Sequence, residues 1–208
     1  MKSDLKGLQI FEIGLILSIV TNFLGILDLG KVFSFVISFI SVCVFMIMLT
    51  GTERLTEYDI GFIKTRNLLI AGVLLSSVIA LLTGMAMADI EYWMSVTAVI
   101  FVIARAAVYI AVVGMAISGC IGMSKIEKGR KSQERIDLEN EYKEKCNRTW
   151  KVYLWVSVVS IFTDVVGVML INQDQIIWTA LIWVTGAAVM VSGAIAAKRV
   201  YEAFYLCS

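Results

Sequence analysis

Long apolar stretches separated by short polar links set the pattern of this chain. Six stretches of about twenty residues or more run over 7–27, 32–50, 67–88, 92–123, 152–172 and 176–197. A helix rises about 1.5 Å per residue, so about twenty apolar residues cross a hydrocarbon layer roughly 30 Å thick. The pattern therefore predicts an all-α integral membrane protein with six transmembrane helices.

Polar links at 28–31, 89–91 and 172–175 join these stretches in pairs and predict three helical hairpins. The predicted organisation is a first hairpin at 1–50, a cytoplasmic interfacial loop at 51–66, a second hairpin at 67–123, a charged cytoplasmic helical segment at 124–151, a third hairpin at 152–197 and a cytoplasmic tail at 198–208. The 51–66 loop places Leu55 and Phe62 on one side of a short helix, a pattern typical of a segment lying in the membrane interface.

Composition and charge support a membrane location. Of the 208 residues, 59% are hydrophobic and 17% are charged, against about 25% charged in soluble proteins. The Lys and Arg residues cluster on one side of the predicted helices, apart from Lys31 on the other side and Arg105 inside a helix. The positive-inside rule then places both termini and the two longer loops in the cytoplasm. We expect the membrane to be the plasma (cytoplasmic) membrane. Tyr153 is among the aromatic residues expected to anchor the helices at a boundary.

The hairpins share a short sequence motif. The first reads SIVTNFLG at 18–25 and the third reads SIFTDVVG at 160–167, with four of eight positions identical. The second reads SVIALLTG at 77–84 and keeps only the Ser-to-Gly spacing. Two interpretations stay open: a triplicated hairpin arranged about a pseudo-threefold axis, or a chance alignment of residues that are common in membrane helices.

Small residues recur every fourth position on three predicted helices and indicate faces where helices pack closely. The three sets are Ala80, Gly84 and Ala88; Gly114, Ser118 and Gly122; and Ala188, Ser192 and Ala196. These faces pack either against helices of the same chain or against a protein partner.

Arg105 interrupts the apolar run IFVIARAAVYIAVVG at 100–114. It lies twelve residues from Trp93, about 18 Å of helix, and so near the centre of the bilayer. An exposed Arg costs at least about 3 kcal/mol there, so its side chain should face protein, water or an opposite charge. Asp164 and Glu12 are the candidate partners, and Asp164 is favoured because it lies deeper.

Two interpretations of Arg105 follow. One is a structural ion pair with Asp164 that joins two helices. The other is a docking point for an anionic solute, in a ligand-binding set near the bilayer midplane. That predicted set comprises Arg105, Asp164, Glu12, Asn22, Thr21 and Thr163.

The charged cytoplasmic segment 131–150 is predicted to be helical because Glu repeatedly precedes Lys or Arg by four residues. This spacing and order stabilise a helix. Leu138, Tyr142, Cys146 and Trp150 form an apolar stripe along it. The segment is either a solvated helix or a docking element for a protein partner.

Catalytic and cofactor motifs are absent from the sequence, which contains no His and no paired CxxC cysteines. We therefore expect no enzymatic activity, no metal or other cofactor and no nucleic-acid partner; the expected partners are the lipid bilayer and a small-molecule solute. The sequence favours a small-solute binding or transport protein with a midplane polar site. The alternative is a non-catalytic accessory or scaffold subunit of a membrane complex.

Overall fold

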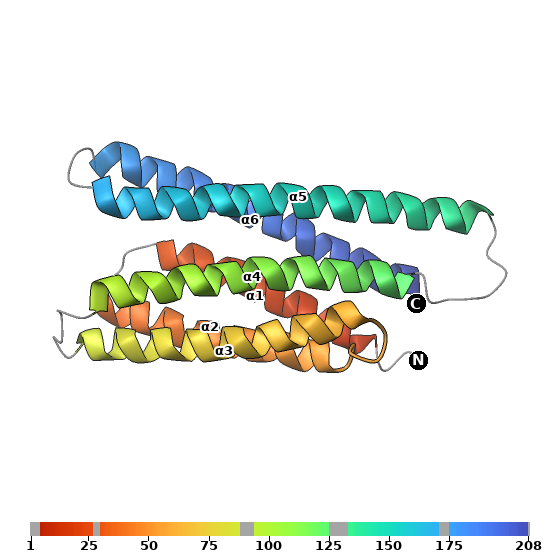
Figure 1. The fold of residues 1–208 in the computed structure, drawn as a ribbon, viewed down its shortest axis with the longest axis horizontal. Helices are drawn as coiled ribbons and strands as arrows, with labels where there is room; N and C mark the ends of the chain where they lie inside the picture. Colours follow the sequence, from red (N-terminus) through yellow and green to blue (C-terminus); the bar gives the residue numbers. More distant parts are fainter. Residues whose placement is uncertain (1–4, 27–29, 88–93, 125–132, 171–174, 208) are drawn as a thin grey trace.

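The fold is all-α, as predicted. The computed structural model describes residues 5–26, 30–87, 94–124, 133–170 and 175–207, which form six helices and no strand (Figure 1). The helices are α1 (Lys6–Ile26), α2 (Lys31–Glu53), α3 (Ile60–Met87), α4 (Met94–Ser124), α5 (Gln133–Leu170) and α6 (Gln175–Cys207). Each of the six is long and apolar enough to cross a membrane, because a helix satisfies its own backbone hydrogen bonds in lipid.

The helices form a group of four, α1 to α4, with the α5–α6 hairpin packed against it (Figure 1). Each of α1 to α4 packs against the next, and α6 reaches across to both α1 and α4. Both chain ends lie at the same end of the bundle, where α1, α3 and α5 begin. We call this the charged end and the opposite one the tip end.

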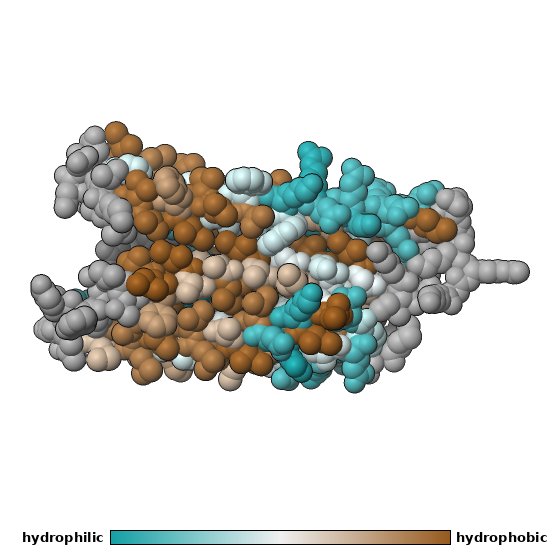
Figure 2. Space-filling view, viewed as in Figure 1, coloured by the Kyte–Doolittle hydropathy of each residue, from teal (hydrophilic) through white to brown (hydrophobic). Residues whose placement is uncertain are grey.

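The surface separates into an apolar and a charged part. Figure 2 shows hydrophobic side chains covering the bundle from the tip end to beyond its middle, and hydrophilic side chains gathered toward the charged end. Large side chains stand exposed on the apolar part, including Leu74, Leu81, Trp155 and Phe162, each more than 60% exposed. Such a surface is covered by lipid, so the chain is an integral membrane protein.

The closest packing lies in the half of the bundle near the charged end. There the main chains of α1 and α2 cross closely: a methyl group added at Gly51 would lie 2.6 Å from the main-chain nitrogen of Phe11. Near the same end, α6 contributes Ala196, Val200 and Ala203 to the core. Figure 1 shows why: α6 is inclined, so it lies beside α5 at the tip end and beside α1 and α4 at the charged end.

Two predicted segments of the chain are more structured than expected. The predicted bounds of the interfacial loop, 51–66, are too wide, since α2 continues to Glu53 and α3 already begins at Ile60. Leu55 and Phe62 are buried in the core, at 0% and 1% exposed, so they do not face the membrane interface. The predicted tail at 198–208 is likewise helical as far as Cys207.

The helix predicted at 131–150 is present from Gln133 onward as the first half of α5. Its apolar stripe packs inside the molecule: Tyr142 and Cys146 are buried, while Leu138 stays exposed. Trp150 lies against Gly114 of α4. The stripe is therefore occupied by the protein's own helices, which neither of the two interpretations of this segment anticipated.

Part of each of two small-residue faces meets other segments of the same chain. Gly114 faces Trp150, Gly122 faces Asp59, and Gly84 faces Phe35, whereas Ser118 and Ala188 are exposed. Ala88 lies outside the described residues. The three-hairpin repeat stays a hypothesis: the main chain of α6 comes close to that of α4, whereas the main chain of α2 comes close to neither α4 nor α6.

Candidate functional site

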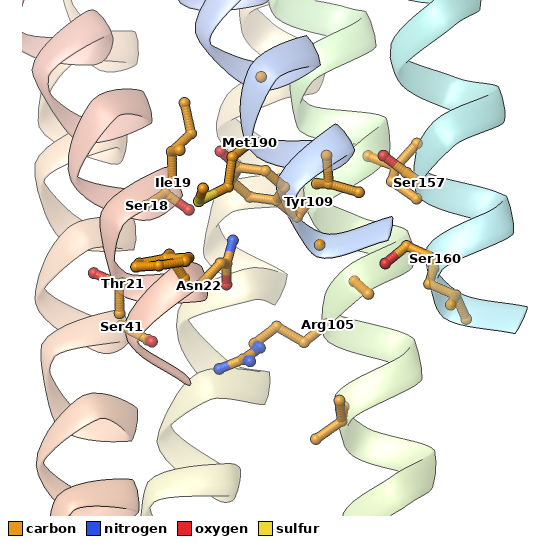
Figure 3. A pocket seen from close by; sticks show the side chains of 18 of the residues that line it. Ser18, Ile19, Thr21, Asn22, Ser41, Arg105, Tyr109, Ser157, Ser160 and Met190 are labelled. Atoms are coloured by element: carbon orange, nitrogen blue, oxygen red, sulfur yellow. The ribbon is translucent and has the colours of Figure 1, made fainter. Parts of the chain in front are cut away.

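A polar cavity of about 210 Å³ lies between α1, α2, α4, α5 and α6 (Figure 3). Its polar and charged lining residues are Ser18, Thr21, Asn22, Ser41, Arg105, Tyr109, Tyr153, Ser157, Ser160 and Asp164. The remaining lining is mostly apolar, with Phe45, Val102, Val189 and Met190 among it. Arg105 and Asp164 are the only charged residues in this lining, so the cavity carries one positive and one negative group.

Arg105 is partly buried on α4 and lines the cavity. Figure 3 shows its side chain reaching across toward the side of α1 and α2. Among the residues that the structure describes, it forms no hydrogen bond and no ion pair. Its five N–H donors are therefore available to whatever enters the cavity.

Asp164 lines the cavity from α5 and remains exposed. No carboxylate oxygen of Asp164 lies within 4 Å of a side-chain nitrogen of Arg105, so the predicted ion pair is absent. The reason is geometric: the guanidinium of Arg105 extends away from α5, where Asp164 stands. The two groups share the cavity but are not partners in it.

Ser157 and Ser160 precede Asp164 at helical spacing and line the same cavity from one face of α5. The Ser157 hydroxyl is buried and makes no hydrogen bond of standard geometry in the described part of the chain, although it interacts with the phenol of Tyr153 one turn earlier on α5. Buried hydroxyls are nearly always satisfied by protein or by ordered water. A hydroxyl of this kind on the cavity wall is available to water or to a solute inside the cavity.

The α1 wall is formed by Ser18, Thr21 and Asn22. Thr21 donates a 2.7 Å hydrogen bond to the main-chain oxygen of Leu17, as hydroxyls in membrane helices commonly do. Asn22 is exposed and has no such bond in the described residues, so its amide faces the cavity uncommitted. Four of the six residues predicted to form the ligand-binding set, including Arg105 and Asp164, therefore line this cavity.

Glu12 and Thr163 lie outside this cavity. Glu12 lines a separate groove of about 340 Å³ between α1 and α6, together with Lys198 and Tyr201. Thr163 donates a 2.9 Å hydrogen bond to the main-chain oxygen of Val159. Both were placed by depth along a helix, which does not say toward which side of the helix a side chain points.

Several lining residues were not foreseen from the sequence. Tyr109 packs edge-on against Phe45 of α2, with ring centroids 6.2 Å apart, and so closes the cavity between α2 and α4. Tyr153, predicted as a boundary anchor, is instead 1% exposed and belongs to the core and the cavity wall. A Tyr near the end of an apolar stretch looks the same in sequence whether it faces lipid headgroups or the interior.

The matching motifs of the first and third hairpins both contribute to the cavity. Ser18 corresponds to Ser160 and Asn22 to Asp164, and all four line it. In the second hairpin the residue at the polar position is Leu81, which is 69% exposed on the outer surface. The correspondence between the first and third hairpins therefore extends to their place around the cavity.

Within the described residues, no group of three His, Cys, Asp or Glu side chains is arranged to hold a metal ion. No family model, curated protein or solved structure matches the chain. The cavity itself is therefore the basis for assigning a function to this six-helix membrane protein.

Proposed function

We propose that the protein binds a small solute in the cavity between α1, α2, α4, α5 and α6, and moves it across the membrane. Arg105 holds an anionic group of that solute. The observation that carries the proposal is an unpaired guanidinium lining a polar cavity inside the membrane-spanning part of the chain.

Energetics favour an occupant. A charged side chain in the bilayer interior is costly unless it meets water or an opposite charge. Arg105 lies eleven residues, or about 16 Å, into α4, too deep to reach bulk water easily. Asp164 does not neutralise it. An anionic group in the cavity would supply the missing charge and accept several N–H donors at once.

The cavity has the size of a small-solute site. Its volume of about 210 Å³ exceeds that of an engineered cavity of about 150 Å³ that holds benzene. The expected occupant is therefore a small molecule of at least about that size.

The packing of the bundle suggests how a solute would enter. The tightly packed half lies toward the charged end, which would close the cavity on that side. The α5–α6 hairpin is drawn against α1 and α4 mainly at that end (Figure 1). With the charged end in the cytoplasm, as the positive-inside rule predicts, the cavity would load from the outer side. Transport would then require the hairpin to rock against the other four helices.

Native mass spectrometry of the protein released gently from its own membrane tests the proposal. A bound small molecule should accompany the wild type and be lost in Arg105→Gln. The matched control is Arg148→Gln, which removes the same charge from an exposed position of α5 and should leave the adduct in place. A wild type that carries a second protein chain and no small molecule would instead favour the accessory-subunit function.

A further inference from the structure

The charges of the cavity define the kind of solute more narrowly than size alone. One cation, Arg105, and one anion, Asp164, line it, and neither has a partner among the described residues. An anion would satisfy Arg105 and leave Asp164 without a partner, and a cation would do the reverse. An uncompensated charge within the membrane is costly, so the best occupant neutralises both.

We propose that the cavity takes a small zwitterion, with a carboxylate or similar anionic group at Arg105 and an ammonium group at Asp164. This inference rests on the proposed function and names the class of its solute. Short amino acids, in which a single carbon or a few carbons separate the two groups, are the chemistry that fits.

Uncommitted groups on the two walls match the two ends of such a molecule. The amide of Asn22 lines the same cavity from α1 and carries N–H donors that an anionic group can use. On the α5 wall, Ser157, Ser160 and Asp164 present oxygen atoms that accept hydrogen bonds from an ammonium group. Figure 3 shows the guanidinium of Arg105 on one side of the cavity and the two serines on the other.

A zwitterion can join two charges that do not touch each other. In an α-amino acid, about 2.5 Å separates the nitrogen from the carboxyl carbon, and the C–O bond adds about 1.2 Å. With a charge-assisted hydrogen bond of about 2.8 Å at each end, the bridge is at most about 9 Å long. Arg105 and Asp164 make no ion pair within 4 Å and line different walls of the cavity, so in this proposal the solute joins them.

Binding of three matched solute series to the purified full chain in lipid nanodiscs tests this inference near pH 7. The zwitterions are glycine, alanine and 4-aminobutyrate. The anions are acetate, propionate and butyrate, and the cations are methylammonium, ethylammonium and propylammonium. Titration calorimetry gives the dissociation constants. We expect at least one zwitterion to bind tenfold or more tightly than every anion and every cation.

Two variants assign the two ends. Asp164→Asn should weaken zwitterion binding at least tenfold and strengthen the binding of anions, because it removes the negative charge from the cavity. Arg105→Gln should abolish binding of zwitterions and anions alike. Arg148→Gln is the matched control and should bind as the wild type does, and the thermal unfolding of each variant shows that it is folded.

The outcomes separate this inference from the proposed function. If an anion binds the wild type as tightly as the best zwitterion, the zwitterion inference is overturned and the anion-binding function stands. Preferential binding of a cation would overturn both the inference and the role given to Arg105. If none of the nine solutes binds the folded wild type, the zwitterion inference falls, and the native mass spectrum then decides whether the proposed function falls with it.

Discussion

The hydroxyl of Tyr142 in α5 donates a 2.9 Å hydrogen bond to the main-chain oxygen of Arg199 in α6. The Arg199 side chain in turn donates to the hydroxyl of Thr149 at 3.3 Å and forms an ion pair with Glu202. The contacts of Tyr142 and Thr149 join the two helices of the third hairpin at the charged end, whereas the ion pair lies within α6. They help to hold α6 against α5.

Tyr142→Phe should therefore destabilise the fold. The phenyl ring keeps the buried packing, but the Arg199 oxygen loses its partner from α5. A hydrogen bond of this kind contributes about 1 kcal/mol, or roughly a fivefold change in the unfolding equilibrium. Chemical unfolding of the protein in lipid nanodiscs measures it. Tyr201→Phe is the control, because the Tyr201 hydroxyl pairs only with the exposed Tyr205 hydroxyl; an equal loss in both variants would contradict a specific role of Tyr142.

Gly51→Ala should disrupt the packing of α1 against α2. The added methyl group would lie 2.6 Å from the main-chain nitrogen of Phe11 and 2.8 Å from the main-chain oxygen of Gly7. Main-chain atoms cannot rotate away, so the helices must separate, at a cost of about 1–3 kcal/mol. At Gly25 the nearest atom, on Ile37, is 3.8 Å away, and Gly25→Ala should be neutral or stabilising. Thermal unfolding compares the two, and equal melting temperatures would show that the helices do not cross this closely.

Arg105 and Asp164 should show little energetic coupling in the absence of a solute. A buried ion pair loses about 3–5 kcal/mol when one partner is removed, and removing both restores much of that loss. No such pair exists here, so the coupling measured with Arg105→Leu, Asp164→Leu and the double variant should stay within about 0.5 kcal/mol. Unfolding of the four solute-free proteins gives this value. A coupling of 2 kcal/mol or more would support the interpretation of Arg105 and Asp164 as a structural ion pair.

The six helices could be predicted from the sequence because each crosses the membrane as an independently hydrogen-bonded unit. Arg105, Asp164 and Asn22 could also be singled out, since polar side chains in apolar stretches are costly unless they face the interior. Their spacing along each helix did not reveal that Arg105 turns toward α1 and α2, away from α5. That direction depends on how the helices are rotated about their axes.

Other features depended on contacts between distant segments. Leu55 and Phe62 have the spacing of a surface helix, but the turn between α2 and α3 buries both in the core. Ser157 resembles any serine in a membrane helix, and only its neighbours show that its hydroxyl makes no hydrogen bond of standard geometry in the described part of the chain. The stripe of Tyr142 and Cys146 indicated a packed face without indicating that α6 covers it.

Ser157→Ala should separate solute binding from stability. The Ser157 hydroxyl is buried without a hydrogen bond of standard geometry in the described part of the chain, so its removal should leave the solute-free protein as stable as before, or more stable by about 1 kcal/mol. Binding of the best zwitterion should weaken, because the variant lacks one acceptor for the ammonium group; the loss of one hydrogen bond corresponds to about a two- to tenfold rise in Kd.

The control is Ser76→Ala in α3: that hydroxyl is also buried and unpartnered, but it does not line the cavity. Both variants should therefore behave alike in unfolding experiments, and only Ser157→Ala should weaken binding. Equal Kd values for the two variants would show that Ser157 makes no contact with the solute.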